Sequence, residues 1–301
     1  MAASHNSTSP QGKKNRREAA RETARVDREA EKKRRRRNRV LLQGGIGIGI
    51  LAVIAIIGLV VVNFSSPGSP GPRNMASGGI LFAAKSSAVA PVLTDRAPAN
   101  GALTPTKTNA GDGIAHIVTY VDWACPACKS FEATYTTKIA SLVSAGKATL
   151  EVHPISILDR NYAGSRYSSR AANVAACVAN FIPARYLDAQ TAFYENQPAE
   201  GTTGLTNAGM IRLLKNAGIN DPAVTECVNA ESFTGWMAKV TTATTTTQSL
   251  VDVAAGGFST PTVVVNGKRW TNQGDFMAFV SQVSGSPAPS PSPTPSPTAS
   301  K

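Results

Sequence analysis

The feature that most constrains this chain is a pair of cysteines, Cys125 and Cys128, placed where a strand-like segment gives way to a helix-like one. Residues 114–121 (IAHIVTYV) are β-branched and aromatic, which predicts a buried strand. Residues 126–145 repeat apolar side chains on one helical stripe, which predicts an amphipathic helix. The chain therefore must build a strand–helix unit with two thiols at the start of the helix.

This placement favours reactive sulfur. Pro126 suits the first helical turn, because that turn has no use for its missing N–H. Cys125 then stands at the helix N-terminus, where free N–H groups and the helix dipole favour a thiolate. Cys128 lies about 5–6 Å away on the same face, a separation that a disulfide can bridge. We predict that Cys125 is the exposed nucleophile and that Cys128 is its resolving partner.

Two other uses of such a cysteine pair compete with redox chemistry: a purely structural disulfide and half of a metal site. A zinc site would need a second such pair or two closely spaced histidines. The chain has only His5, His116 and His153, and its other two cysteines are fifty residues apart. We therefore expect neither a metal nor a cofactor.

The remaining elements follow from periodicity and turn residues. A second strand is expected at 148–155, and a helical block at 160–255 in which the Thr241–Thr247 cluster is poor helix material. The end of the domain reads as strand, Asn-Gly turn, strand and helix. These last segments are 262–265, 266–267, 268–271 and 275–283. The predicted order is β-α-β, a helical block, then β-β-α.

Together these features resemble the DsbA family of extracytoplasmic oxidoreductases, in the membrane-anchored form found in actinobacteria. The resemblance rests on TYVDWACPACKSFE (Thr119–Glu132), the inserted helical block and GFSTPTVVVNG (Gly257–Gly267), and it covers roughly residues 113–284. It implies an α/β class and a thioredoxin fold with a helical insertion at about 158–255. We expect the folded domain to span 80–285.

The resemblance also implies roles for individual residues. Cys125 and Cys128 would exchange electrons with substrate sulfur, and Pro261, in cis, would keep an amide from blocking them. The backbone of Thr260 would pair with the substrate peptide like a strand. The expected substrate-binding residues are Thr260, Pro126 and Ala127. Well-known relatives carry His where this chain has Ala127, so its oxidising power is expected to be weaker.

Residues near the cysteine pair are predicted to have no catalytic role. Asp122 is a candidate cap for the helix start and Glu132 a candidate influence on the Cys128 proton, but a solvated face without catalytic role is favoured for both. Trp123 is expected to pack around the active-site turn. His116 and His153 fall in strand patterns and are expected to be structural.

The second pair of cysteines, Cys177 and Cys227, falls in the helical block. If Cys125 and Cys128 pair by proximity, these two form the remaining bond. Closing that loop of about 51 residues would stabilise the fold by roughly 4 kcal/mol. Two buried free thiols and a second redox pair are the alternatives, and a structural disulfide is favoured.

A run of 23 uncharged residues, 40–62, predicts a membrane-spanning helix about 34 Å long. A cleaved signal peptide is the alternative, but the run is long and no A-x-A site follows closely. A buried core helix is disfavoured by the adjoining RRRRNR. We expect a transmembrane signal anchor at 40–64, with a cytoplasmic N-terminus and an extracytoplasmic catalytic domain.

The overall charge of +12 belongs mainly to the N-terminal tail. Residues 11–39 carry 14 Lys/Arg and 5 Asp/Glu, which leaves a net charge of only +3 for the rest. Contact of a basic tail (1–39) with anionic lipid is thus favoured over a nucleic-acid partner. The segments 65–79 and 286–301 are rich in Pro, Gly, Ser and Thr, which predicts a flexible spacer and a disordered tail.

The expected function is a thiol:disulfide oxidoreductase in the cell membrane that introduces disulfides into exported, cysteine-containing proteins. The resemblance implies a membrane reoxidase of the quinone-linked type, either DsbB-like or vitamin K epoxide reductase-like. A disulfide isomerase or reductase of the same fold is the nearest competing function. Two candidates from different functional classes are a noncatalytic, membrane-anchored copper chaperone and a wall-linked scaffold.

Overall fold

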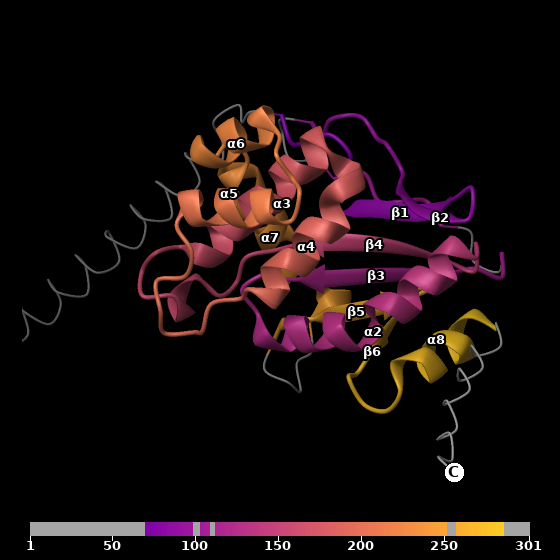
Figure 1. Cartoon of the computed structure of the whole chain (residues 1–301). Helices are drawn as coiled ribbons and strands as arrows, with labels where there is room; N and C mark the ends of the chain where they lie inside the picture. Colours follow the sequence, from indigo (N-terminus) through magenta and orange to yellow (C-terminus); the bar gives the residue numbers. More distant parts are fainter. Residues whose placement is uncertain (1–69, 99–102, 109–111, 252–256, 286–301) are drawn as a thin grey trace, which may run out of the picture. The chain divides into compact units, whose positions relative to one another are not determined.

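The structure, a computed structural model, describes residues 70–98, 103–108, 112–251 and 257–285, which belong to one compact unit (Figure 1). The predicted basic tail, membrane anchor and C-terminal tail lie outside the described residues. Within those ranges, no helix is both long and apolar enough to cross a membrane.

A mixed six-stranded sheet organises the domain, in the order β2-β1-β4-β3-β5-β6. Its strands, numbered as in Figure 1, are β1 (Ile80–Lys85), β2 (Ala88–Pro91), β3 (Ala115–Val121), β4 (Ala148–Pro154), β5 (Thr262–Val265) and β6 (Lys268–Trp270). The central strands β3 and β4 are parallel, and every other pairing is antiparallel. The predicted strands at 114–121, 148–155, 262–265 and 268–271 are confirmed within one residue at each end.

The hairpin of β1 and β2 was not predicted from the sequence. Its two turn residues, Ser86 and Ser87, both have positive φ values, 51° and 60°, as the type I′ form of a two-residue hairpin turn requires. Ile80 and Phe82 are buried where β1 pairs with β4. The hairpin thus extends the sheet by two strands beyond the predicted set.

The prediction that a flexible spacer continues to residue 79 is wrong for residues 70–79. Met75 is fully buried, and the Gly71 N–H donates to the Ala97 carbonyl at 2.9 Å. The Asn74 side chain donates to the Ala179 carbonyl at 2.8 Å and so ties this segment to the helical insertion. A Pro/Gly-rich composition did not reveal these partners, because they lie far away in the sequence.

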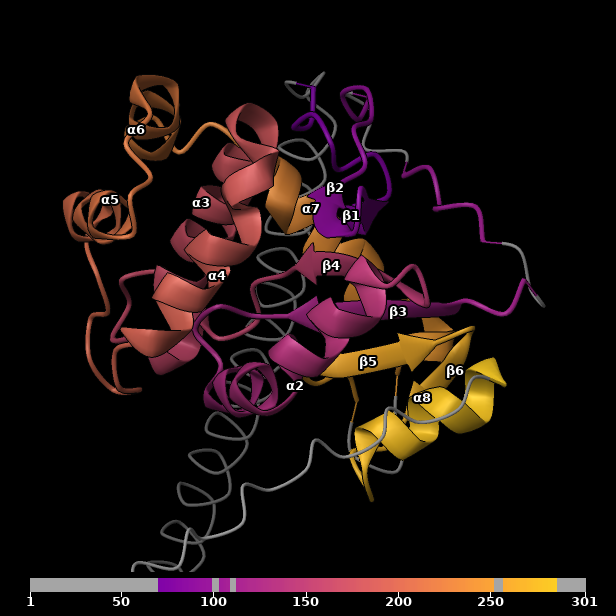
Figure 2. The same cartoon turned by 45° about the vertical axis from the view of Figure 1, so that its right-hand side comes forward.

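Helices α2 (Pro126–Ser144) and α8 (Phe276–Ser284) cover one face of the sheet (Figure 2). Phe131 of α2 packs edge-on against Phe276 of α8, with ring centroids 5.4 Å apart. Buried residues of both helices belong to one apolar cluster with the strand residues Ile117 and Val263. This packing fixes the start of α2 against the end of β3.

The crossover from β4 to β5 carries the helical insertion (Figures 1 and 2). Its helices are η1 (Asp159–Asn161), α3 (Tyr167–Phe181), η2 (Pro183–Arg185), α4 (Tyr186–Glu195), α5 (Asn207–Asn216), α6 (Pro222–Asn229), α7 (Thr234–Thr245) and η3 (Gln248–Leu250). The threonine cluster begins inside α7. Its residues up to Thr245 are helical because Val240 and Thr244 are buried, and the Thr242 hydroxyl is satisfied by donating to the Ala238 carbonyl at 3.0 Å.

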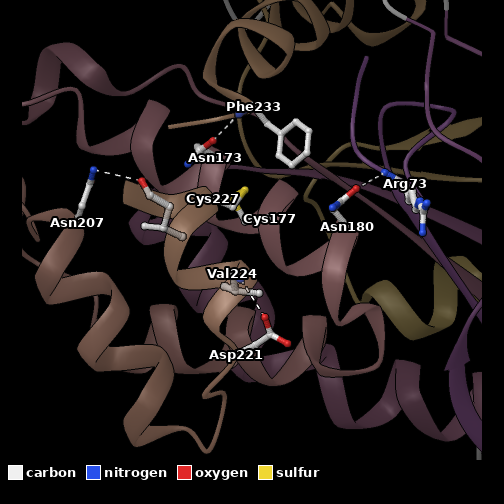
Figure 3. The surroundings of a disulfide bond; sticks show 10 residues. Arg73, Asn173, Cys177, Asn180, Asn207, Asp221, Val224, Cys227 and Phe233 are labelled. Atoms are coloured by element: carbon white, nitrogen blue, oxygen red, sulfur yellow. Dashed lines mark hydrogen bonds between the residues drawn. A yellow bond between two sulfur atoms is a disulfide. The ribbon is translucent and has the colours of Figure 1, made fainter. Parts of the chain in front are cut away.

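A disulfide between Cys177 of α3 and Cys227 of α6 lies inside the insertion, which confirms the predicted pairing (Figure 3). Helix α3 is buried along almost its whole length, because its alanines let neighbouring helices approach closely. The Asn173 side chain accepts from the Phe233 N–H at 2.8 Å beside this bond. Helix α3 therefore lies in an apolar cluster that the insertion shares with the strand residues Ile80, Phe82 and Val152.

Candidate active site

The two nearby thiols lie where β3 ends and α2 begins. Cys125 is the N-cap residue of α2, with extended backbone angles, and Pro126 occupies the first helical turn. Cys125 and Cys128 are both free thiols in this structure. Cys125 is only 6% exposed and Cys128 only 1%. The prediction of an exposed Cys125 is therefore wrong, and the exposed residues of the motif are Pro126 and Ala127.

The strand pairing explains why residues 135 positions apart meet at the sulfur. β5 runs antiparallel to β3, and Thr262 pairs with Tyr120. Residues just before β5 must therefore lie beside residues just after β3. The Thr260–Pro261 peptide bond is cis, and the Cys125 Sγ lies 3.4 Å from the Thr260 carbonyl oxygen. The structure thus brings Thr260 and Pro261 to the cysteine pair, while Pro261 itself is buried.

The two thiols differ strongly in acidity. A hydrogen bond from the Cys128 thiol, partly opposed by burial, lowers the pKa of Cys125 to about 6, and the Thr260 side chain and the N–H groups of Cys128 and Ala127 add to this effect. Burial raises the pKa of Cys128 well above its ordinary value, and the neighbouring Cys125 raises it further. At neutral pH one sulfur is therefore a thiolate and the other keeps its proton. This asymmetry exists although the residue before Cys128 is Ala127, which offers the sulfurs no side-chain donor.

Asp122 is neither solvated nor a cap of α2. It is fully buried, and its carboxylate accepts hydrogen bonds from the Ala124 N–H at 2.9 Å, the Ile157 N–H at 2.9 Å and the Ser168 hydroxyl at 2.6 Å. Burial raises the pKa of Asp122 to about 6, although these bonds oppose the shift. The residue joins the active-site turn, the chain after β4 and helix α3, a role that no local pattern indicated.

Trp123 packs under the active-site turn, as predicted, against Phe193 at a centroid distance of 4.6 Å. Its indole N–H donates to Gln190 of α4 at 3.2 Å, and the Gln190 amide in turn donates to the Glu132 carboxylate at 2.9 Å. Burial raises the pKa of Glu132. Glu132 is thus a half-buried partner of Gln190 on α4, and the expected solvated face is wrong for this residue as well.

Both strand histidines are structural, as predicted. His116 contacts Thr149 at 3.0 Å and Asp112 at 3.1 Å, and His153 contacts Glu151 at 3.0 Å. Neither is among the residues that contact the sulfurs. In the part of the chain that the structure describes, no three His, Cys, Asp or Glu side chains gather as metal ligands would.

Two residues that carried no sequence signal reach the active-site turn from the insertion. Tyr162 donates to the Ala124 carbonyl at 2.8 Å, and Gln197 donates to the Trp123 carbonyl at 3.0 Å. They lie 38 and 74 positions from their partners, so only the folded insertion brings them there.

Known proteins are similar to this chain in sequence profile or in fold. The sequence profile described as Thioredoxin matches residues 108–284, and no curated protein matches the sequence. The reduced disulfide bond oxidoreductase DsbG from Mycobacterium tuberculosis is 28% identical, with a TM-score of 0.47 over 58% of this chain and 80% of that one. Reduced DsbA from the same organism is 24% identical, with a TM-score of 0.49 over 70% and 94%. The thiol-disulfide oxidoreductase MdbA from Actinomyces oris is 20% identical, with a TM-score of 0.45 over 60% and 84%.

Proposed function

This chain belongs to the thioredoxin family, and on that premise we propose that it is a thiol:disulfide oxidoreductase whose exchanging pair is Cys125 and Cys128. The observation that carries the proposal is the pairing of an acidic thiol with a buried, protonated one at the start of a helix. A structural pair has no need of such asymmetry, whereas exchange depends on it. The attacking sulfur must be a thiolate, and the sulfur of lower pKa leaves faster.

In the proposed reaction, a substrate thiolate attacks Cys125 in the oxidised Cys125–Cys128 disulfide. A substrate–Cys125 disulfide forms, and Cys128 departs with the bonding electrons and takes up a proton. A second substrate thiolate then attacks the first substrate sulfur. The substrate leaves with its own disulfide, and Cys125 leaves as a thiolate. Two electrons have passed to the enzyme, and the low pKa of Cys125 stabilises this reduced product.

We propose that Thr260, Pro126 and Ala127 bind the substrate near the sulfur. Pro126 and Ala127 are the exposed residues of the motif, and Thr260 lies beside Cys125. An extended peptide can pair with the backbone of Thr260 as an added strand would. The buried Pro261 would support this segment and present no N–H to the sulfur.

The direction of electron flow that we propose is oxidation of exported proteins, outside the membrane that residues 40–64 would span. The positive charges before that segment support a location of the domain outside the membrane. The low pKa of Cys125 supports oxidation of substrates, because it stabilises the reduced enzyme. Returning the enzyme to its oxidised state requires an electron acceptor, which we propose is a membrane reoxidase linked to quinones. The competing role is a reductase or isomerase of the same fold.

The test is the reduction potential of the full-length protein in detergent, together with its ability to oxidise a reduced test protein that has several cysteines. An oxidase should have a potential well above about −270 mV, the thioredoxin value, and should form disulfides in the test protein. The Cys125→Ser variant, which keeps the fold but lacks the nucleophile, is the matched control and should be inactive. A potential near that of thioredoxin would assign the reductase role, and activity that survives Cys125→Ser would refute the exchange mechanism.

A further inference from the structure

Three consecutive carbonyl groups lead up to Cys125, and each contacts a side chain of the helical insertion. These contacts are Tyr194 Oη to the Asp122 oxygen at 3.5 Å, Gln197 Nε2 to the Trp123 oxygen at 3.0 Å and Tyr162 Oη to the Ala124 oxygen at 2.8 Å. The first is long, and the other two have ordinary hydrogen-bond lengths. The backbone entering the active site is therefore held from the insertion and not only from the sheet.

The donors of the two shorter bonds, Tyr162 and Gln197, come from two loops that are linked to each other. Tyr162 directly follows η1 and is fully buried, and Gln197 lies two residues beyond the end of α4. The Tyr162 hydroxyl also lies 3.2 Å from the Pro198 carbonyl. Because the contact with Ala124 is shorter, the single hydroxyl proton points mainly toward Ala124. Tyr162 thus joins the active-site turn to the loop after α4.

These bonds decide which ends of the peptide dipoles face the sulfur. A carbonyl oxygen is the negative end of its peptide group and an N–H is the positive end. The Ala124–Cys125 peptide is held at both ends, because its oxygen accepts from Tyr162 and its N–H donates to the Asp122 carbonyl at 2.9 Å. With the oxygens turned toward the insertion, the groups beside the Cys125 sulfur include the N–H groups of Ala127 and Cys128.

We propose that Tyr162 and Gln197 are positioning residues, which fix Cys125 for attack by holding the carbonyl oxygens of Ala124 and Trp123 toward the helical insertion. This inference deepens the proposed function and rests on it only for its consequence in exchange. The position of the sulfur can be measured without any substrate. The Tyr162 hydroxyl stays a donor at every physiological pH, because burial raises its pKa to about 12.

The test compares Tyr162→Phe and Gln197→Met with wild type, in the full-length reduced protein. Both variants keep the size of the side chain and lose the donor. The matched control is Tyr167→Phe, because the Tyr167 ring packs at a tilt against Tyr162, with ring centroids 4.9 Å apart, and its buried hydroxyl has no hydrogen-bond partner among the described residues. The readouts are the pH dependence of Cys125 alkylation and the reduction potential. A merely structural role would leave both unchanged.

Each donor variant should raise the pKa of Cys125 by about half a unit, because a carbonyl oxygen that is no longer held can turn its negative end toward the thiolate. Alkylation at about pH 5 should then slow roughly threefold, and the reduction potential should fall. Tyr167→Phe should match wild type. Circular dichroism checks that each variant folds. If one donor variant does not fold, the alkylation profile and the reduction potential of the other donor variant test the inference.

Wild-type alkylation profiles and potentials in the folded donor variants would overturn the inference. That result leaves the proposed function standing if the wild-type protein oxidises the test protein and Cys125→Ser does not. Conversely, a wild-type protein without exchange activity refutes the function, while a shifted Cys125 pKa in Tyr162→Phe or Gln197→Met still supports the positioning role.

Discussion

Replacing Cys128 by alanine tests the origin of the acidity of Cys125. The largest cause of the low Cys125 pKa is the hydrogen bond that it accepts from the Cys128 thiol. Cys128→Ala removes this donor, whereas Cys128→Ser keeps a donor at the same position. Because Cys177 and Cys227 are joined in a disulfide, Cys125 is the one free thiol left in either variant, and its titration can be followed alone.

The expected magnitude follows from the charge on the acceptor. A hydrogen bond to a charged group contributes about 1.5–3 kcal/mol, and about 1.4 kcal/mol corresponds to one pKa unit. In Cys128→Ala the pKa of Cys125 should rise from about 6 to roughly 7–8. At the middle of that range, a pKa of about 7.5, the thiolate fraction at pH 7 would fall from about nine-tenths to about one-quarter, and the alkylation rate would fall about fourfold.

The assay is the rate of iodoacetamide alkylation of the reduced full-length protein between about pH 4 and pH 9, with thiolate absorbance as a second measure. Cys128→Ser should titrate close to wild type, which separates loss of the donor from loss of the sulfur atom. If the alanine and serine variants both titrate near the wild-type value, the Cys128 donor contributes nothing. The N–H groups at the start of α2 would then account for the acidity by themselves.

Two further predictions concern stability. The pKa of Asp122 is about 6 in the folded protein and 3.8 ordinarily, so the folded state binds the Asp122 proton more tightly than the unfolded state does. This proton contributes about 3 kcal/mol to the free energy of unfolding below about pH 4, and the contribution is lost as the pH rises through 6. Urea unfolding of the oxidised protein at several pH values should show this loss, and the Asp122→Asn variant should not show it. Equal pH profiles of stability for the two proteins would contradict a raised pKa for Asp122. The double variant Cys177→Ala, Cys227→Ala should lose about 4 kcal/mol of unfolding free energy, since the bond spans 50 positions, while its Cys125 titration stays that of wild type.

Much of the fold was readable from local patterns. The strand before Cys125, the helix after it and the Asn266–Gly267 hairpin each carry their signal within a short stretch of sequence. The disulfide between Cys177 and Cys227 followed from counting cysteines. These predictions depend on neighbours in the sequence or on a small number of possible pairings, and they are confirmed.

What local patterns missed depends on distant partners. Asp122 looks like a surface residue in the sequence, but Ile157 and Ser168 supply donors that make its burial tolerable. The short strand β2 has no alternation and is recognisable only by its pairing with β1. Cys125 is covered because the Thr260 segment meets it across the sheet. A short stretch of sequence contains neither the donors to Asp122 nor the Thr260 contact with Cys125, because these partners lie far apart along the chain.

The Cys177–Cys227 bond has a consequence for a protein that would trade disulfides. Its sulfurs belong to residues that are 0% and 4% exposed, so a foreign thiolate has no line of approach along the S–S axis unless α3 and α6 part. The chain thus holds two buried sulfur pairs: one lies directly beside the exposed residues Pro126 and Ala127, and the other lies between two helices of the insertion. The disulfide of the insertion is set apart from the exchanging pair by its place between α3 and α6, and not by burial alone.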